Sequence, residues 1–482
     1  MNKQDTSKSS FKSEIAGTVS GFDPQTKTWI PVLSTKKSTE LPHLDGQLFI
    51  DPALLTAFAD DVGHIIHRHP AAVLKPGSIN DIIHMVQFAR QHRLKIGARG
   101  QGHTTFGQSQ VAAGIVVDMS TLNAPPLISS DRVEVGAGVT WKTLLLATLA
   151  HNLMPPVLTG YLGLSVGGTL SVGGIGGSGY RFGAQVDNVL ELQVVTGAGQ
   201  LEICSPSQNP DLFEAALAGL GQCALIVRAT LRLVPAETHT RLCLLFYADL
   251  PTMLHDERLL IADGRFDHVV GYVLPGPDGQ WVFFIEAARY FSPPTAPSNA
   301  RLLEGLSFVH GAEQLTDLPF FDFANRVEAE IEALKANGRF TLPHPWFDMF
   351  VPDSQIDEYA LNVFATLTPD DLGPDFPILF FPLKSQKFKQ PFLCVPDEEI
   401  FFLFDILRSA PDDPVVVDRM LTSNRELFER ARQLGSKHYT ISAITLSKQD
   451  WKRHFQPVWG KLVIAKHRFD PDNVLTPGPG IF

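Results

Sequence analysis

The feature that most restricts how this chain can fold is a glycine-rich tract spanning residues 160–183. Within residues 161–179, eight of nineteen residues are glycine and four are serine or threonine. Apolar residues such as Leu164, Val166 and Leu170 are interleaved with the glycines, and a flexible linker would not carry them. The tract therefore predicts packed loops whose backbone a large planar ligand can approach closely.

A second segment, residues 98–108, contains glycines beside a histidine. Gly100 and Gly102 have no side chains, so backbone N–H groups can line a concave anion site there. His103 adds an imidazole nitrogen next to that site. Taken alone, this segment is equally compatible with a tight turn that contains a histidine by chance.

Composition narrows the classes of protein. The 482 residues are 44% hydrophobic and 19% charged, which is typical of a folded protein of two or three domains. The net charge of −11 and the lack of a Lys/Arg run argue against nucleic-acid binding. No stretch reaches about 18 consecutive apolar residues, which argues against a membrane span. The polar beginning of the chain is unlike a secretory signal, and four widely spaced cysteines fit reduced, buried thiols in a cytoplasmic protein.

Hydrophobic periodicity predicts a mixture of helices and strands, so the expected fold class is α+β. Strands are expected at residues 71–74, 95–98, 114–118, 132–135, 189–195, 201–203, 224–234 and 281–285, and helices at 79–89, 140–149, 211–218 and 327–336. Ser78, with Asp81 three residues later, is expected to form a capping box at the start of the first helix. Around Pro235 the composition changes to Phe-rich strands and Pro-rich loops, which indicates a second domain.

Several common motifs are absent or out of context. Residues 219–224 match G-x-G-x-x-A, but a predicted helix precedes them and a strand follows, which reverses the Rossmann order. No P-loop sequence and no H-E-x-x-H occur. His64, His67 and His69 lie close together, but no further ligands at suitable spacing accompany them. An ordinary polar stretch is therefore favoured, and no metal site is predicted.

Five collinear motifs resemble those of the cytokinin dehydrogenases, which are FAD enzymes of the vanillyl-alcohol-oxidase superfamily with a PCMH-type FAD-binding domain. The motifs are G-x-G-H-[ST] at residues 100–104, V-G-G-T-L-S at 166–171, N-V-L-E-L-x-V-x-T-G at 188–197, G-L-G-Q at 219–222 and F-D-P-x-x-x-L-x-P-G-x-x-I-F at 469–482. The likeness covers most of residues 44–235 and 440–482, and the middle of the chain more faintly.

The resemblance implies a two-domain α+β flavoprotein. Residues 40–235 and 436–482 would together form the FAD-binding domain. Residues 236–435 would form an inserted α+β substrate domain, or cap, that covers the flavin ring. Residues 1–39 precede these domains as a polar segment that is expected to be poorly ordered.

The family's cofactor site, transferred position by position, implies FAD bonded covalently to His103. The other implied contacts come from Ala98, Gly100, Gln101 and Gly102 through backbone, from Thr104 and Gln108 through side chains, from Ser165, Ser171, Ile175 and Ile226 near the pyrophosphate and adenine, and from Thr476 near the flavin ring. Related berberine-bridge enzymes form a second flavin bond through a cysteine before V-G-G. Residues 151–165 contain no cysteine, which implies a single histidyl link.

The chain departs from the family on the substrate side. Gly160 stands where the family has the aspartate that binds the substrate amine and is its proposed base. Val270 replaces a family glutamate, and Pro479 replaces the glutamine of a P-G-Q motif. The catalytic acid is therefore unknown. Asp267 and Glu286 are candidates, although Glu286 matches a glutamate of the family and is interpreted as structural.

The resemblance implies an FAD-dependent oxidoreductase that transfers a hydride from a small organic substrate to the flavin. Its family reaction is oxidation at a C–N bond of N6-substituted adenines, so an adenine-type cytokinin is a candidate substrate. The electron acceptor and the oligomeric state stay open. Two alternatives remain: a flavin-dependent oxidase of an alcohol or other apolar small molecule, and a flavin-binding protein without turnover.

Overall fold

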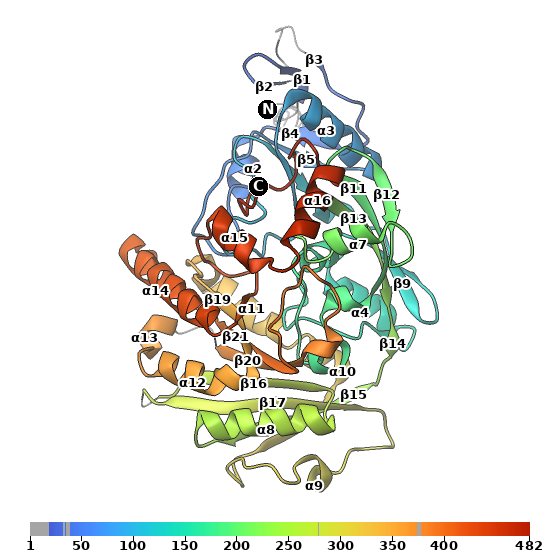
Figure 1. The fold of residues 1–482 in the computed structure, drawn as a ribbon. Coiled ribbons are helices and arrows are strands. Elements are labelled where there is room, and N and C mark those ends of the chain that lie inside the picture. The colour runs from blue at the N-terminus through green and yellow to red at the C-terminus, as the bar shows by residue number, and fades with distance from the viewer. Residues whose placement is uncertain (1–18, 32–33, 35–38, 278, 374–376) are drawn as a thin grey trace, which may run out of the picture.

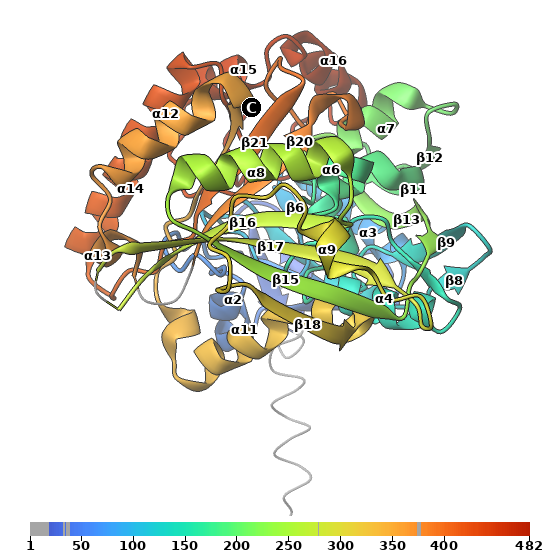
Figure 2. The same cartoon turned by 90° about the horizontal axis from the view of Figure 1, so that it is seen from below.

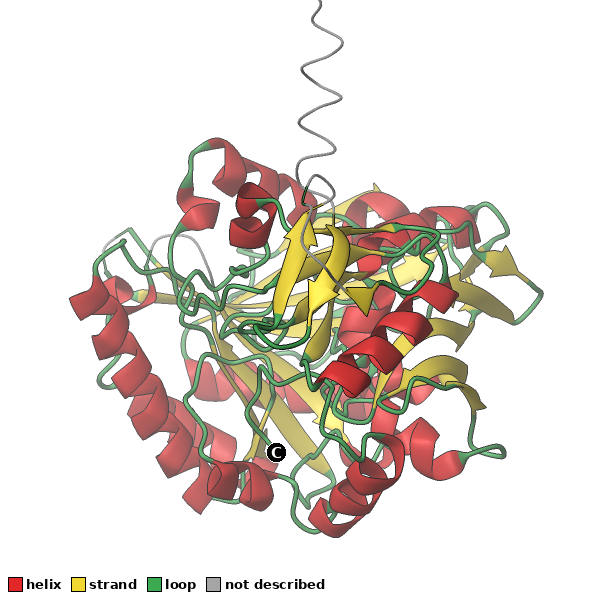
Figure 3. Ribbon diagram, turned by 90° about the horizontal axis from the view of Figure 1, so that it is seen from above, coloured by secondary structure: helices red, strands yellow, loops and turns green. Residues whose placement is uncertain are grey.

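A computed structural model describes residues 19–31, 34, 39–277, 279–373 and 377–482 (Figure 1). The fold mixes helices and mainly antiparallel sheets, which confirms the predicted α+β class. Seen from above, helices lie around much of the outside while strands occupy the middle (Figure 3). Among the helices within those ranges, none is both long and apolar enough to cross a membrane.

A small antiparallel sheet precedes the first domain, so the expected lack of order in the polar N-terminal segment is wrong for part of it. Its strands are β1 (Val19–Asp23), β2 (Thr28–Pro31) and β3 (Thr39–Glu40). Phe22 is fully buried, and its ring centroid lies 4.8 Å from that of Trp29 and 5.4 Å from that of Phe88. These aromatic contacts attach the segment to the first domain; residues 1–18 lie outside the described ranges.

A four-stranded sheet contains the predicted strand–helix–strand unit. Its order is β4 (Gln47–Phe49), β5 (Ala72–Lys75), β7 (Ile115–Asp118) and β6 (Ile96–Arg99). Strands β5, β7 and β6 run parallel, and α3 (Ile79–His92) connects β5 to β6. Near the C-terminus, Leu475 forms a parallel bridge with Ile96. The last residues of the chain therefore return to this first sheet.

The start of α3 differs from the predicted capping box. Ser78 makes no side-chain capping hydrogen bond. The Asp81 carboxylate instead accepts hydrogen bonds from the backbone N–H groups of Gly77 at 2.8 Å, Asp45 at 2.7 Å and Gly46 at 2.8 Å. Three charge-assisted bonds to backbone outweigh one local cap, so the carboxylate joins the chain before β4 to the start of α3.

This arrangement predicts that Asp81→Ala destabilises the fold far more than Ser78→Ala. The first substitution leaves three backbone N–H groups without their acceptor, which costs about 3–5 kcal/mol. The second removes a hydroxyl that bonds nothing, so we expect a change within about 0.5 kcal/mol. Chemical unfolding of the two variants, side by side, measures the difference. Equal losses would contradict the assignment of Asp81 as the anchor.

A five-stranded antiparallel sheet completes the first domain. Its order is β12 (Leu201–Cys204), β11 (Val189–Thr196), β13 (Ala224–Arg232), β9 (Arg132–Gly136) and β8 (Leu127–Ile128). The glycine-rich tract forms loops and two short helices: α5 (Val166–Leu170) packs against β9 and β13 of this sheet, whereas α6 (Gly179–Phe182) packs against β20 (Ile378–Lys384). Val166 and Leu170 are fully buried, so the interleaved apolar residues anchor the tract. The predicted packed loops are confirmed.

An eight-stranded sheet forms most of the second half of the chain (Figure 1). Its order is β18 (Gln314–Pro319), β15 (His239–Tyr247), β17 (Trp281–Phe291), β16 (His268–Pro275), β20 (Ile378–Lys384), β21 (Ile400–Ile406), β19 (Phe347–Pro352) and β22 (Lys437–His438). The view from below shows α8 (Leu250–Asp263), α12 (Asp353–Phe364) and α14 (Pro414–Gln433) along one side of it (Figure 2).

The remaining elements connect these sheets or cover them. The other helices are α2 (Pro52–Ala57), α4 (Trp141–Leu149), α7 (Pro210–Ala216), α9 (Asn299–Leu302), α10 (Phe320–Ala324), α11 (Val327–Ala336), α13 (Pro369–Leu372), α15 (Lys448–His454) and α16 (Trp459–Phe469). Short 3₁₀ turns are η1 (Met119–Thr121), η2 (Gln185–Asn188), η3 (Arg339–Thr341) and η4 (Ser385–Lys387), and β10 (Leu153–Met154) pairs with β14 (Val234–Pro235). Residues 219–224 follow α7 and lead into β13, which confirms the reversed order of that glycine motif.

The four cysteines are free and buried, which confirms the predicted burial. Burial raises the pKa of Cys223 to about 12. At neutral pH this thiol stays protonated and unreactive.

Candidate active site

A cavity of about 620 Å³ lies between the glycine-rich loops and one face of the eight-stranded sheet, a size typical of small-molecule sites. On the sheet side it is bordered by alternate strand residues: Val270 and Tyr272, Leu379 and Phe381, and Leu403 and Asp405. Side chains alternate across a strand. The intervening residues therefore face the opposite side, where they form a core with α8, α12 and α14.

All twelve positions transferred from the family's cofactor site border this cavity. They are Ala98, Gly100, Gln101, Gly102, His103, Thr104, Gln108, Ser165, Ser171, Ile175, Ile226 and Thr476. They come from β6 and its following loop, the glycine-rich tract, β13 and the C-terminal segment. The fold brings these distant segments together on one wall, while their individual contacts with a cofactor stay predictions.

Glycines shape the loop that carries His103. Gly102 has a φ of 68°, a conformation that glycine adopts with little strain. A Cβ atom at Gly100 would lie 2.0 Å from Ser165 Oγ. Only a residue without a side chain therefore allows this loop and the glycine-rich tract to approach so closely.

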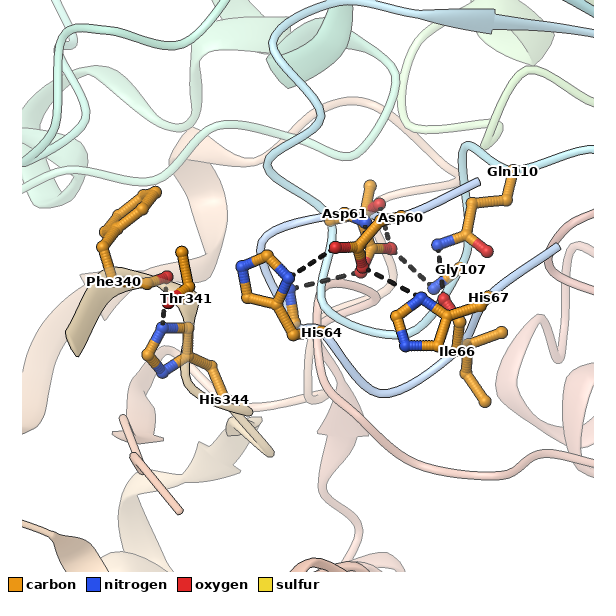
Figure 4. A network of polar contacts seen from close by, with 12 residues as sticks. Asp60, Asp61, His64, Ile66, His67, Gly107, Gln110, Phe340, Thr341 and His344 are labelled. Atoms are coloured by element: carbon orange, nitrogen blue, oxygen red, sulfur yellow. Dashed lines mark hydrogen bonds and ion pairs between the residues drawn. The ribbon is translucent and has the colours of Figure 1, made fainter. Parts of the chain in front are cut away.

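A buried carboxylate anchors the same loop (Figure 4). Thr104 Oγ1 and Gly107 N each donate a hydrogen bond of 2.7 Å to Asp61 Oδ2. Gln108 Oε1 accepts a hydrogen bond of 2.8 Å from Phe106 N. The side chains of Thr104 and Gln108, which we expected to contact the cofactor, thus make hydrogen bonds within the protein and hold the loop.

The histidines near this anchor contact a carboxylate. His64 Nδ1 lies 2.6 Å from Asp60 Oδ2, and His67 Nδ1 lies 3.3 Å from Asp60 Oδ1 (Figure 4). In the part of the chain that the structure describes, no group of three or more His, Cys, Asp or Glu residues is placed to hold a metal ion. Asp60 and its histidines lie beside the loop anchor Asp61 rather than in the cavity wall.

His103 lies in the cavity wall between aromatic rings. Its ring centroid is 5.4 Å from that of Tyr161 and 5.8 Å from that of Trp346. Burial, together with the charges of His344 and Lys335, lowers the pKa of His103 to about 4. The imidazole is therefore neutral at neutral pH, and a neutral imidazole nitrogen keeps the lone pair that a nucleophile needs.

The two positions that depart from the family both border the cavity. A Cβ atom at Gly160 would meet only Val327 Cγ2, at 4.0 Å, beyond its own neighbours in the chain, so a side chain there has open space. Val270 is 1% exposed and pairs with Glu286 across β16 and β17. The family's aspartate position is thus open to substitution, whereas its glutamate position is tightly packed.

Neither candidate acid from the sequence is among the described residues that border the cavity. Glu286 accepts hydrogen bonds from Arg326 Nε at 2.9 Å and Nη2 at 2.5 Å, and contacts His268 Nε2 at 3.1 Å. Burial alone would raise the pKa of Glu286, but Arg326 and His268 overcome this effect and lower it to about 2. Asp267 forms an ion pair of 3.1 Å with Arg289. Both carboxylates form ion pairs with arginine side chains, which supports structural roles for them.

Sequence reasoning missed the acidic residues of the sheet wall. Asp348 on β19 and Asp405 on β21 both border the cavity, and neither belongs to any of the five family motifs. The sequence did contain a signal that could have identified them: each is a single acidic residue within an otherwise apolar strand. A charged residue inside such a strand needs a partner or a function.

The comparisons with known proteins agree with this geometry. A family model described as an FAD binding domain matches residues 70–205. A second, described as "Cytokinin dehydrogenase 1, FAD and cytokinin binding", matches residues 274–482. The fold is similar to a crystal structure of 6-hydroxy-D-nicotine oxidase from Arthrobacter nicotinovorans, with a TM-score of 0.71 and 18% identity over 93% of this chain and 100% of that chain. The two family models, matched on this fold, define an FAD-dependent oxidoreductase.

Sequence relatives identify the family within the FAD-dependent oxidoreductases. The chain is 38% identical over 435 residues to an uncharacterized oxidoreductase in the fasciation locus of Rhodococcoides fascians, covering 90% of this chain and 99% of the relative. It is 34% identical over 485 residues to cytokinin dehydrogenase 4 of Oryza sativa subsp. japonica, covering 91% and 90%. The chain belongs to the cytokinin dehydrogenase family, which confirms the resemblance in its motifs.

The chemistry of the cavity wall fits FAD. On the loop side the wall consists of glycine backbone, the hydroxyl residues Ser165, Thr169 and Ser171, and apolar side chains. Arg326 and Arg339 are the only Lys or Arg residues among the described residues at the border, and both come from around α11 rather than from the loops. Backbone N–H and hydroxyl groups can bind two phosphates without a basic side chain.

Proposed function

We propose that this chain binds FAD covalently through His103 and oxidises a small organic donor at a C–N bond. The observation that carries the proposal is the cavity, which all twelve proposed cofactor positions border together with residues of the eight-stranded sheet. The relatives named cytokinin dehydrogenase support a C–N bond as the site of oxidation. An adenine with a substituted N6 amine is the first donor to test.

The chain's own residues would bind the cofactor, orient its attachment site and exclude water. FAD, when bound, supplies the acceptor for a hydride. Gly100 and Gly102 let the loop backbone approach the cofactor, while the rings of Tyr161 and Trp346 hold the His103 imidazole between them. The apolar side chains of the sheet wall exclude water from the reacting carbon, which keeps a transferring hydride from side reactions.

We also propose that the eight-stranded sheet is the substrate domain. It begins with β15, just after the proposed boundary at residue 235. Its last strand, β22, lies just beyond the other proposed boundary at residue 435. The family model that includes cytokinin binding covers most of this region. The remaining residues, 40–235 and about 439–482, would then form the FAD-binding domain.

A second candidate function is oxidation of an alcohol or another apolar donor. It is favoured by Gly160 and Val270, which remove both family carboxylates from the cavity wall. A donor that needs no carboxylate to bind its amine would suit such a wall. Membership of a family of oxidoreductases argues against the third alternative, a flavin-binding protein without turnover.

An anaerobic bleaching screen tests these proposals. The purified yellow protein is mixed without oxygen with N6-isopentenyladenine, N-methylbenzylamine or benzyl alcohol, and its visible absorbance is followed. We expect an amine to bleach the flavin. Bleaching by the alcohol alone would favour the second function. A flavin that stays oxidised with every donor would contradict the proposed activity.

A further inference from the structure

Two aspartates meet on the sheet wall of the cavity. Asp348 and Asp405 are direct partners in the antiparallel pairing of β19 with β21. Opposite side chains of such a pair have Cβ atoms about 4.5–5.5 Å apart on the same face. Both residues border the cavity, and they are 0% and 6% exposed. The fold therefore places two carboxyls side by side, facing the space between the loops and the sheet.

These carboxyls lack the partners that Asp81 and Glu286 have. Among the described residues, no backbone N–H and no basic side chain donates a hydrogen bond to either carboxylate oxygen of Asp348 or to Oδ1 of Asp405; the polar side chains that interact with Asp348 are Asp405 and Ser442. By contrast, Asp81 accepts three backbone bonds and Glu286 is held by Arg326. A buried polar atom without a partner is costly, so a pair of them in a cavity wall points to a ligand that supplies donors.

The groups that surround Asp348 and Asp405 do not neutralise the negative charge of these carboxyls. Asp405 faces Leu379 of β20 across the strand pairing, and the segment after β22 contributes Ser442 and Tyr439 near Asp348. Helices α12 and α14 pack against β21 and β19, on the side of the sheet away from the cavity. Across the cavity, the ionisable groups around α11 are Arg326, Glu330 and Arg339, and Arg326 is bound by Glu286.

Among the described residues neither carboxyl forms an ion pair with Lys, Arg or His, so the pair cannot easily carry two charges. Burial raises the pKa of Asp348. Burial and the charge of Asp348 together raise the pKa of Asp405 well above its ordinary value. Like-charged carboxyls so close together ionise in two separate steps, so one proton stays between them over a broad range of pH.

We propose that Asp348 and Asp405 share one proton and bind the N–H group next to the C–H bond that is oxidised, replacing the carboxylates missing at positions 160 and 270. This inference rests on the proposed function. Oxidation of H–C–N–H to C=N releases the carbon-bound hydrogen with both bonding electrons and the nitrogen-bound hydrogen as a proton. The flavin is the oxidant that accepts the hydride, and the ionised carboxylate accepts the proton.

The kinetic test uses the holoenzyme and the variants Asp348→Asn and Asp405→Asn. Stopped-flow reduction with N6-isopentenyladenine and N-methylbenzylamine is measured across pH, and the donor that reduces the wild type faster is used for comparison. We expect each variant to lose about 100-fold or more in the rate of reduction, because asparagine cannot accept the proton. The pH dependence of the rate should also flatten in both variants.

A matched control is Glu257→Gln. Glu257 is likewise a buried carboxyl whose two oxygens lack a partner, but it lies on α8 and outside the cavity border. This variant should reduce at the wild-type rate. Comparing this variant with the aspartate variants distinguishes the effect of removing any buried acid from the effect of removing an acid that contacts the donor.

A readout independent of activity is thermal unfolding against pH. A carboxyl whose pKa is raised in the folded state adds stability below its unfolded pKa and loses it as pH rises through the folded value. The wild type should therefore lose about 2–5 °C of Tm relative to the Asp348→Asn/Asp405→Asn double variant between about pH 5 and pH 8. Parallel Tm curves would overturn the shared proton.

The outcomes separate this inference from the proposed function. If no amine bleaches the wild-type flavin, the proposed function fails and the inference fails with it. If an amine bleaches the wild type and both aspartate variants reduce within threefold of its rate, the function stands and the inference is overturned. Slow reduction by the aspartate variants with normal reduction by Glu257→Gln supports the carboxyl pair.

Discussion

His103→Ala is expected to abolish covalent flavin attachment completely. The unaltered protein should stay yellow after acid precipitation and should fluoresce as a band on a denaturing gel. The variant should release all of its FAD into the acid supernatant, because the other cavity contacts are non-covalent. His103 is the histidine that the glycine loop presents to the cavity, and its lowered pKa keeps a nitrogen free to form a bond.

A second histidine variant controls for changes in the loop. His64 lies near the anchor of the same loop, where it contacts Asp60 at 2.6 Å, but it does not border the cavity. His64→Gln should therefore keep a fluorescent band. Flavin released by the unaltered protein, or a fluorescent band that persists in His103→Ala, would contradict attachment at this residue. Loss of the band in both variants would indicate that the loop, rather than the imidazole, is what matters.

Local patterns in the sequence predicted the elements of the first domain well. They failed where contacts between residues far apart in the sequence determine the structure. The strand–helix–strand unit around α3 follows from alternation and helical spacing, so its elements were found. Asp81 was assigned a local cap because Asp45 and Gly46 are more than thirty residues away in sequence. The N-terminal sheet was missed because its stability comes from Phe22 and Trp29 packing on a helix that neither adjoins in the chain.

In the candidate site, too, one side could be predicted from local sequence patterns and the other could not. Glycine positions identify the cofactor side because a backbone that must approach a ligand tolerates no side chain. The sheet side is less visible in the sequence. Alternation shows that Asp348 and Leu403 lie on definite faces of their strands, but not which face meets the cavity. That choice depends on where α12 and α14 pack, which is decided by contacts between distant segments.

Gly160→Asp is expected to raise the turnover of N6-isopentenyladenine about tenfold to hundredfold over a weak wild-type rate. At this position a carboxylate would accept a hydrogen bond from the substrate's secondary amine. A hydrogen bond from an amine to a carboxylate is worth about 1.5–3 kcal/mol, which corresponds to a change in rate of this size. The cavity has room for the change, because a Cβ atom at Gly160 comes no closer than 4.0 Å to Val327.

The other family position is a poor place for the same experiment. Val270 is buried and pairs directly with Glu286. A glutamate there would have to fit a longer side chain into a packed strand position, which is destabilising. Any loss of activity in Val270→Glu would then be confounded by misfolding. Gly160 avoids this difficulty, since it faces the open cavity rather than a packed strand.

Steady-state kinetics with a dye acceptor compare the wild type, Gly160→Asp and the control Gly460→Asp. A Cβ atom at Gly460 would meet nothing within 4 Å beyond its own helix, and the residue lies on α16, outside the cavity border. The control therefore tests the same chemical change where no substrate is held, and its turnover should equal that of the wild type. Robust wild-type turnover that the aspartate at position 160 fails to improve would show that the missing carboxylate does not limit the reaction. The amine would then be bound elsewhere on the wall, and Asp348 and Asp405 are the acidic residues on its sheet side.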